Sequence, residues 1–323
     1  MKNNFKEIYD SSLQKPEEFW KNISEDVFWF KKPTKILNKS NPPFYKWFED
    51  GVTNSCYNAL DLHVDLGRGD KTALIYDSPI TGNKAKFTFN DLKQKVSKFA
   101  GALNSQGIVK GDRVIIYMPM IPEAVVAMLA CGRIGAIHSV VFGGFASNEL
   151  ASRIDDSKAK ILITASCGFE PGRTVEYRPL VDEALKLAKH KVEKVILYQR
   201  KGYEVKLNEP LEISWEESLI NASDKDCVEM GSNDLAYILY TSGTTGVPKG
   251  IVRDTGGHIV ALKWTMKNIY NIDTDDVWWS ASDIGWIVGH SYIVYAPLFK
   301  GCTTVLFEGK PIGTPDAGAF WKI

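Results

Sequence analysis

The chain has 323 residues, of which 44% are hydrophobic and 24% charged, so it can bury a sizeable core as one large domain or as two. Its 39 basic residues balance its 39 acidic ones, which argues against a nucleic-acid-binding surface, since such a surface needs a basic excess on one face. The longest uninterrupted apolar run, 124–131, is far too short to span a membrane, and the N-terminus lacks an apolar signal core. We expect a cytoplasmic protein.

The cysteines and histidines show no ligand spacing. The five cysteines are odd in number, form no CxxC pair and stand far apart, at Cys56, Cys131, Cys167, Cys227 and Cys302. A disulfide framework and a structural zinc site are therefore disfavoured, and reduced, mostly buried thiols are expected. No metal site is predicted.

The first 70 residues are rich in aromatic and turn residues, and they are expected to form an irregular arm on a larger body. From residue 71 onward, short apolar runs typical of strands alternate with helical patterns. The expected strands are 72–77, 112–118, 136–142, 159–165 and 194–199. Asn90 is the expected N-cap of a helix that stops at Gly107, and Pro122 the expected first residue of the helix 122–135.

A second unit follows a charged insert, 200–230, which is expected to be a surface hairpin or loop. It contains a strand at 235–240 and a helix at 256–270, whose predicted buried stripe is Ile259, Leu262, Met266 and Ile269. Alternating strands and helices indicate an α/β fold with mostly parallel sheets flanked by helices. The predicted division is an arm at 1–70, a first α/β subdomain at 71–230 and the start of a second at 231–323.

The segment "YTSGTTGVPKG", residues 240–250, follows a strand directly. A loop at the C-terminal edge of a parallel strand faces the crevice where α/β proteins bind ligands. Its glycines let the backbone approach an anion, its hydroxyls and N–H groups donate hydrogen bonds, and Lys249 adds one positive charge. These features suit a polyphosphate. A polar turn between two strands is the plainer alternative.

The loop is not a Walker A motif, which requires Gly-Lys followed by Ser or Thr, because here Pro248 precedes Lys249 and Gly250 follows it. It resembles the signature of the adenylate-forming superfamily of acyl-CoA synthetases, luciferases and peptide-synthetase adenylation domains. The resemblance implies the large N-terminal domain of that fold, with ATP, Mg²⁺ and coenzyme A as substrates. It also implies a set of ATP-phosphate ligands, namely Thr241, Ser242, Gly243, Thr244, Thr245, Gly246 and Lys249.

Further segments, 41–64, 111–146 and 282–311, resemble the short-chain branch, which makes acetyl-CoA and propionyl-CoA. Segments 166–185 and 309–321 resemble propionyl-CoA synthetases more than acetyl-CoA synthetases. The acetate type usually has Arg where Glu170 stands here and Thr where Val288 stands. The resemblance therefore favours propionate, with an acetate–CoA ligase as the alternative.

The same resemblance implies two further groups of residues. The coenzyme A contacts would be Gly143, Gly144, Glu170, Pro171, Gly172 and Arg173, although Glu170 cannot bind a phosphate as an arginine would. The acyl pocket would be lined by Trp286, Ile287 and Val288. Without the resemblance, the glycine pair is an ordinary loop, Arg173 a surface arginine, and Ile287 and Val288 core residues. His290 is more simply a structural histidine, and Asp283 and Glu308 stand too far apart in sequence to be paired as catalytic carboxylates.

In the family, a carboxylate attacks the α-phosphate of MgATP, and the thiol of coenzyme A then displaces AMP. This chemistry depends on positioning and charge neutralisation, so no catalytic nucleophile is assigned. Relatives continue past the position of Ile323 with an adenine pocket and a C-terminal lid, so the chain resembles an N-terminal fragment with the lid absent. A fragment would have little turnover and would leave apolar surface uncovered. A non-catalytic nucleotide- or CoA-binding protein and a generic α/β binding module remain competing hypotheses.

Overall fold

The larger of two main sheets has seven strands. The computed structural model describes residues 5–241, 248–310, 313, 314, 316 and 318–323. Neighbouring strands in this sheet are parallel except for the last pair, β14 and β15, which are antiparallel. The strand order is β12 (Glu212–Ser214), β11 (Lys194–Tyr198), β8 (Ile161–Ala165), β6 (Arg113–Tyr117), β7 (Ile137–Val140), β14 (Leu235–Thr241) and β15 (Lys249–Asp254).

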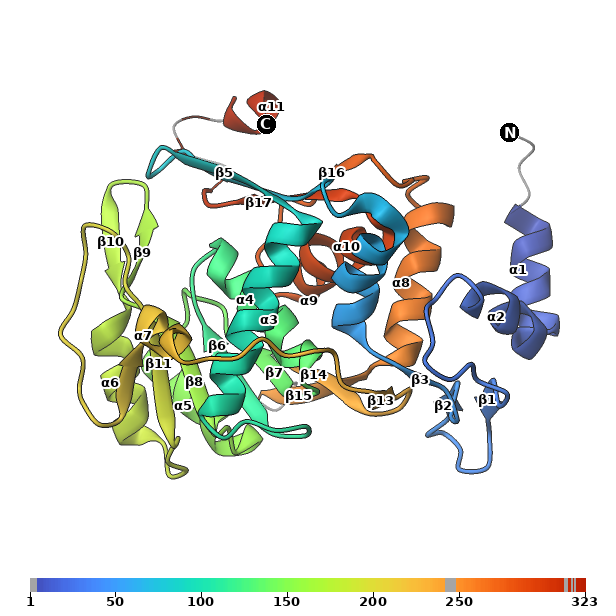
Figure 1. Ribbon diagram of the computed structural model, residues 1–323, viewed down its shortest axis with the longest axis horizontal. Helices are drawn as coiled ribbons and strands as arrows, with labels where there is room; N and C mark the ends of the chain where they lie inside the picture. The colour runs from blue at the N-terminus through green and yellow to red at the C-terminus, as the bar shows by residue number, and fades with distance from the viewer. Residues whose placement is uncertain (1–4, 242–247, 311–312, 315, 317) are drawn as a thin grey trace.

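The smaller sheet has four strands and joins segments from distant parts of the chain (Figure 1). Its order is β16 (Val277–Trp279), β17 (Thr303–Phe307), β4 (Thr72–Ser78) and β5 (Asn83–Thr88). Only β4 and β5 pair in antiparallel fashion, so the prediction of mostly parallel sheets is confirmed. Both sheets draw strands from either side of residue 230, so sheet membership does not follow the predicted subdomain boundary, and that division stays a prediction.

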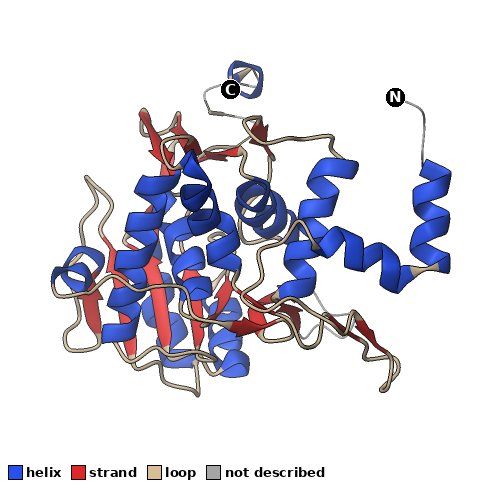
Figure 2. Ribbon diagram, turned by 45° about the vertical axis from the view of Figure 1, so that its right-hand side comes forward, coloured by secondary structure: helices blue, strands red, loops and turns tan. Residues whose placement is uncertain are grey.

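Helices cover the sheets (Figure 2). The chain moves from β6 to β7 in one direction along the larger sheet and from β7 to β8 in the other. Right-handed crossovers then place the two intervening helices on opposite faces. The helices are α1 (Phe5–Gln14), α2 (Pro16–Ser24), α3 (Phe89–Ser105), α4 (Pro122–Arg133), α5 (Ser147–Ser157), α6 (Tyr177–Leu187), α7 (Trp215–Ile220), α8 (Gly256–Asn268), α9 (Ile287–Gly289), α10 (Ala296–Lys300) and α11 (Ala319–Lys322). None of these described helices is both long and apolar enough to cross a membrane.

The N-cap of α3 is Thr88, and the prediction of Asn90 was wrong. Thr88 Oγ accepts a hydrogen bond from the Asp91 backbone N–H at 3.0 Å, and an Asp91 carboxylate oxygen accepts one from the Thr88 backbone N–H at 2.9 Å. This reciprocal capping box satisfies two N–H groups that a helix start otherwise leaves unpaired. Gly107, with a φ of +83°, follows the helix end as predicted.

The insert 200–230 is more than a surface loop, which corrects the prediction. It contains the edge strand β12 and the helix α7, whose N-cap Ser214 accepts a hydrogen bond from the Glu217 N–H at 3.0 Å. Trp215 is buried with its ring stacked on Phe99 of α3 at a centroid distance of 3.6 Å. This long-range aromatic contact holds a segment whose own pattern is weak.

Burial of α8 follows the predicted stripe for three of its four residues. Ile259, Leu262 and Met266 are buried, whereas Ile269 is 61% exposed because the helix has already ended at Asn268.

The N-terminal arm contains regular helices as well as loops, and the Trp20 ring of α2 packs edge-on against the Trp264 ring of α8 at a centroid distance of 6.0 Å. Its other elements are the strands β1 (Leu37–Asn38), β2 (Lys46–Trp47) and β3 (Val52–Thr53) and the wide helical turns η1 (Tyr57–Asp61) and η2 (Val64–Arg68).

Four elements complete the fold. Strands β9 (Cys167–Glu170) and β10 (Arg173–Glu176) form a separate hairpin. Strand β13 (Met230–Gly231) pairs with β3 of the arm in antiparallel fashion. The wide turn η3 (His290–Tyr295) joins α9 to α10 in one continuous helical stretch.

Candidate functional site

The larger sheet has a topological switch point between β6 and β7. The connection after β6, 118–121, leads to α4, whereas the connection after β7, 141–146, leads to α5 in the opposite direction. Diverging connections leave a crevice outside the carboxyl ends of the two strands, which is where open α/β sheets bind ligands. The strand order alone therefore locates a candidate site.

A cleft of about 90 Å³ lies at this switch point. Gly143 and Gly144, both predicted to contact coenzyme A, line it from the connection after β7. A Cβ atom on Gly143 would lie 2.1 Å from the Tyr177 hydroxyl oxygen, so only glycine fits there. Residues from distant segments complete the lining, among them Met118, Phe142, Glu170, Tyr177, Asp283, Glu308 and Lys310.

Glu170, at the end of β9, joins two cations at the rim of the cleft. Its carboxylate accepts hydrogen bonds from Lys310 Nζ at 2.5 Å and from Arg173 Nε at 2.8 Å. Partial burial raises the pKa of Glu170, but the hydrogen bonds from the two cations outweigh it and leave that pKa lowered. Arg173, predicted to meet a phosphate of coenzyme A, is thus held by a carboxylate while its side chain stays 69% exposed.

Pro171 and Gly172, the other predicted coenzyme A residues, form the tip of the β9–β10 hairpin. Gly172 has a φ of +74°, which glycine adopts without strain. A Cβ atom on Gly313 would lie 3.2 Å from the Pro171 Cβ, so the hairpin tip lies beside Gly313. The structure therefore brings the turn 170–173 to the edge of the cleft that the glycine pair lines.

Two carboxylates that sequence distance kept apart, Asp283 and Glu308, line this same cleft. Burial raises the pKa of Asp283 to about 6, even though its Oδ1 accepts a hydrogen bond from the Gly285 N–H at 2.7 Å. Glu308 instead forms a bidentate pair with Arg200, at 2.7 and 3.1 Å. The pairing of β16 with β17 and of β17 with β4 brings the segments of Asp283 and Lys310 to the cleft, and no local pattern encodes that approach.

The predicted acyl-pocket residues are exposed rather than in the core. Trp286, Ile287 and Val288 are 45%, 41% and 45% exposed at the start of the α9 helical stretch. The Trp286 ring lies 5.4 Å from that of Phe142 and 5.9 Å from that of Phe145. The alternative of ordinary core residues is wrong for Ile287 and Val288. This apolar surface adjoins the connection that carries Gly143 and Gly144.

The predicted phosphate loop leaves the same edge of the sheet. Strand β14 runs parallel to its neighbour β7, so both end at the crevice side. Residues Ser242, Gly243, Thr244, Thr245 and Gly246 lie outside the described residues. Thr241 and Lys249 face each other where β14 and β15 diverge, and both are exposed. The loop is thus the connection of an antiparallel pair.

Arg153 of α5 ties the base of this loop to the cleft. Its guanidinium lies 4.8 Å from the ring centroid of Phe145 and 5.3 Å from that of Tyr240, the residue before Thr241. The Tyr240 hydroxyl donates to an Asp156 carboxylate oxygen at 2.6 Å. These contacts fix the end of β14 relative to the connection that follows β7.

His290 is fully buried and does not line the cleft. Its Nδ1 lies 3.1 Å from the Trp286 carbonyl oxygen, and its ring stacks on that of His138 at 5.6 Å. Burial lowers the pKa of His290 to about 4, so the imidazole is neutral near pH 7. A structural role beneath the predicted acyl pocket fits this placement.

A larger cavity, of about 590 Å³, lies between α3, α4 and α7. Its lining mixes aromatic rings with charged side chains, among them Phe99, Trp215, Lys95, Lys98 and Glu123. None of the described residues predicted for ATP, coenzyme A or the acyl group lines it. The smaller cleft at the switch point therefore remains the candidate site, because strand topology and the glycine pair converge there.

Comparison with known families gives two matches. Residues 63–323 match the family described as "AMP-binding enzyme", and residues 5–59 match "Acetyl-coenzyme A synthetase N-terminus". Together the two matches cover almost the whole chain.

Individual proteins agree with this result. The chain is 54% identical over 320 residues to human "Acyl-CoA synthetase short-chain family member 3, mitochondrial", covering 99% of this chain and 47% of that protein. It is 44% identical over 327 residues to "Acetyl-coenzyme A synthetase" of Xylella fastidiosa, covering 99% of this chain and 50% of that protein. Among solved structures, "Acetoacetyl-CoA Synthetase from Streptomyces lividans" superposes with a TM-score of 0.88 at 27% identity, over 97% of this chain and 47% of that one. The chain spans about half the length of the curated relatives it matches.

Proposed function

Because the chain belongs to the AMP-binding enzyme family, we propose that the protein joins a short-chain carboxylate to coenzyme A and, in doing so, cleaves ATP to AMP and pyrophosphate. The observation that carries the proposal is the switch-point cleft. It gathers the glycine pair 143–144, Glu170 and Lys310 beside the end of the strand that leads into the phosphate loop. A cytoplasmic location stays part of the proposal.

The proposed reaction has two steps. A carboxylate oxygen attacks the α-phosphorus of MgATP and pyrophosphate leaves, which gives an acyl-adenylate. The thiol of coenzyme A then attacks the acyl carbon and AMP leaves. Thr241, Lys249 and the intervening loop would neutralise the polyphosphate, while Gly143 and Gly144 let coenzyme A pass close to the backbone.

Propionate is the proposed carboxylate, and acetate is the alternative. Trp286, Ile287 and Val288 offer an exposed apolar surface beside the glycine pair, which suits an alkyl group. One methylene is worth only about 1–3 kcal/mol in such a pocket, so we expect acetate to be used less efficiently rather than rejected.

Because a fragment without the lid would have little turnover, the test uses the protein extended to the full length of its relatives. It follows carboxylate-dependent exchange of label between pyrophosphate and ATP, with acetate, propionate and butyrate compared by kcat/KM. Propionate should give the highest value, and Val288→Thr should shift the ratio toward acetate. Exchange with none of the three, together with measurable binding of ATP or coenzyme A, would favour the non-catalytic binding protein. No binding of either nucleotide would overturn the proposal.

Replacement of Lys249 by alanine should weaken ATP binding at least about tenfold, because a charge-assisted hydrogen bond to phosphate is lost. Titration calorimetry with MgATP measures the change. Lys39→Ala is the matched control, since Lys39 is an exposed lysine in the N-terminal arm. Equal affinities for the two variants would leave the loop without its proposed role and revive the generic binding module.

Replacement of Glu170 by glutamine should tighten coenzyme A binding by up to about tenfold, because it frees Arg173 and Lys310 to meet a phosphate. The gain should shrink as salt rises, since both cations are half exposed or more. Dephospho-coenzyme A, which lacks one phosphate, serves as the control ligand. If the variant binds coenzyme A more weakly than the wild type, Glu170 itself contributes to the contact.

A further inference from the structure

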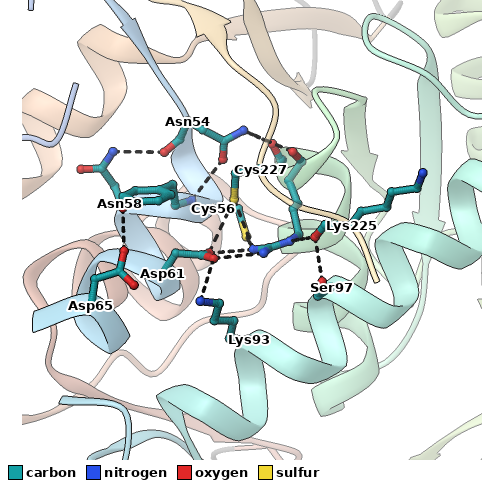
Figure 3. A network of polar contacts seen from close by, with 12 residues as sticks. Asn54, Cys56, Asn58, Asp61, Asp65, Lys93, Ser97, Lys225 and Cys227 are labelled. Atoms are coloured by element: carbon teal, nitrogen blue, oxygen red, sulfur yellow. Dashed lines mark hydrogen bonds and ion pairs between the residues drawn. The ribbon is translucent and has the colours of Figure 1, made fainter. Parts of the chain in front are cut away.

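A second group of reactive side chains lies away from the cleft, where the N-terminal arm meets the chain before β13. Figure 3 shows Cys56 at the start of the η1 turn and Cys227 in the segment that leads to β13. In the short β3–β13 ladder, Thr53 is opposite Met230 and Val52 is opposite Gly231. Cys56 and Cys227 each lie three residues beyond the Thr53–Met230 pair. The ladder brings the two segments together, and the helical turn that begins at Ser55 then places Cys56 near Cys227.

One arginine holds both sulfurs. Arg133 Nη1 lies 3.5 Å from Cys56 Sγ and 3.2 Å from Cys227 Sγ, and it donates to Asp61 Oδ2 at 2.7 Å. The sulfurs and the Asp61 oxygen all lie within 4.8 Å of one another (Figure 3). Cys56 and Arg133 are at most 1% exposed, whereas Cys227 is only partly buried.

The charges around the thiols do not balance if both thiols are protonated. Arg133 and Lys93 are both positive. Arg133 Nη1 contacts Asp61 Oδ2, and Lys93 Nζ lies 3.2 Å from Asp61 Oδ1. Among the described residues, Asp61 is the only carboxylate in direct contact with these two cations. Asp61 shares its one negative charge between the two cations, which leaves part of the Arg133 charge without a counter-ion beside the two sulfurs. A thiolate on Cys56 neutralises it, and Cys227 can donate its S–H proton toward that thiolate or toward Asp61 Oδ2 at 3.5 Å. Burial opposes this ionisation, but hydrogen bonding from Cys227 and the charge of Arg133 leave the pKa of Cys56 lowered.

Two thiols and a carboxylate are also ligand types for a metal ion. Here, however, the Arg133 guanidinium donates to all three groups, and its permanent positive charge opposes a cation in the same place. The arrangement instead matches the surroundings of reactive cysteines, which are electropositive and partly accessible.

We propose that Cys56 and Cys227 form a redox-sensitive dithiol that a hydroperoxide converts into a reversible disulfide. The peroxide enters beside the partly exposed Cys227. The Cys56 thiolate attacks one peroxide oxygen, the O–O bond breaks, and the hydroxide that leaves takes the Cys227 proton to become water. Cys56 is now a sulfenic acid, and Cys227 is a thiolate.

The second step closes the bond. The Cys227 thiolate attacks the Cys56 sulfur, the S–S bond forms, and the S–O bond breaks with loss of hydroxide, which takes up the proton originally lost by Cys56. Two thiols and one hydrogen peroxide thus give one disulfide and two water molecules. A disulfide needs the sulfurs about 2 Å apart, so they must close from their present separation of at most 4.8 Å. The new bond ties the arm to the segment before β13, and a dithiol reductant reverses it.

The experiment is peptide mapping of the purified wild-type protein after treatment with equimolar hydrogen peroxide, with free thiols alkylated before digestion without reductant. We expect one cross-linked peptide pair that contains Cys56 and Cys227, a mass loss of two hydrogen atoms, and full reversal by a dithiol. Cys131 is the internal control: it is fully buried and burial raises its pKa, so it should remain a thiol.

Two variants separate the steps. In Cys227→Ser, Cys56 should stop at the sulfenic acid, which a 1,3-diketone reagent traps, and in Cys56→Ser, Cys227 should react far more slowly. Alkylation of both residues after peroxide treatment, a cross-link between other cysteines, or oxidation of Cys131 before Cys56 would overturn the proposal. None of these outcomes depends on ligase activity, so the proposal stands or falls apart from the proposed function.

Discussion

Replacement of Glu308 by alanine should lower the free energy of unfolding by about 3–5 kcal/mol, because it leaves a buried arginine without its counter-ion. Arg200 and Glu308 are 6% and 3% exposed, and their paired oxygens and nitrogens lie 2.7 and 3.1 Å apart. The Tyr76 hydroxyl also donates to the Glu308 carboxylate. Arg200 follows strand β11 of the larger sheet. Glu308 directly follows β17 and Tyr76 lies within β4, both in the smaller sheet, so the contact joins the two sheets at the cleft.

Urea unfolding of the wild type and the variant measures this change. Glu18→Ala is a matched control, because Glu18 pairs with Lys15 at 3.3 Å while both side chains are more than 60% exposed, and such pairs contribute at most about 1 kcal/mol. A double variant, Arg200→Met with Glu308→Leu, should recover most of the loss, since an apolar pair of similar volume removes the stranded charge. A Glu308→Ala loss no larger than the control's would show that Arg200 finds water or another partner.

Acidification should remove about 3 kcal/mol of stability that a neutral His290 provides. Burial lowers the pKa of His290 from 6.5 to about 4 in the folded state. The unfolded chain therefore binds the proton more readily, so the contribution is fully present above pH 6.5 and is lost as pH falls to about 4. His258, which burial also shifts to a pKa of about 3, should behave in the same way.

The measurement compares the wild type with His290→Asn, whose amide can still donate to the Trp286 carbonyl oxygen. The difference in unfolding free energy between the two proteins should shrink by about 3 kcal/mol from pH 7 to pH 4. Asp283 acts in the opposite direction, because burial raises its pKa to about 6, but both proteins contain it and the difference cancels its effect. A difference independent of pH would mean that the folded protein accommodates a protonated His290.

Local chemistry explains what the sequence predicted well. Strands such as β6 and β8 are short runs of Val, Ile and Leu bounded by polar residues, and they stand where the pattern predicted them. Pro122 begins α4 because its fixed φ and missing N–H suit the first helical position. The N-cap of α3 was misplaced by two residues, since Thr88 and Asn90 are both good caps and only the bond to Asp91 distinguishes them.

The candidate site was predicted in part. Gly143, Gly144 and Glu170, which the family resemblance implied, line one cleft, and their contact with coenzyme A stays a prediction. The exposure of Ile287 and Val288 did not follow from their apolar character, because burial depends on what the rest of the fold places against them. The bond between Glu170 and Lys310 joins residues 140 positions apart, and no local pattern encodes such a pair.

The sequence by itself determined the α/β class, the positions of most strands and helices, and a donor-rich loop suited to phosphate, because these depend on periodicity, capping and residue chemistry over a few neighbours. Only the tertiary structure decided which strands pair, and with that the switch-point cleft, the Arg200–Glu308 bridge and the approach of Cys56 to Cys227. Those contacts arise when burial of apolar surface outweighs the entropy of closing long loops, and that balance is a property of the whole chain.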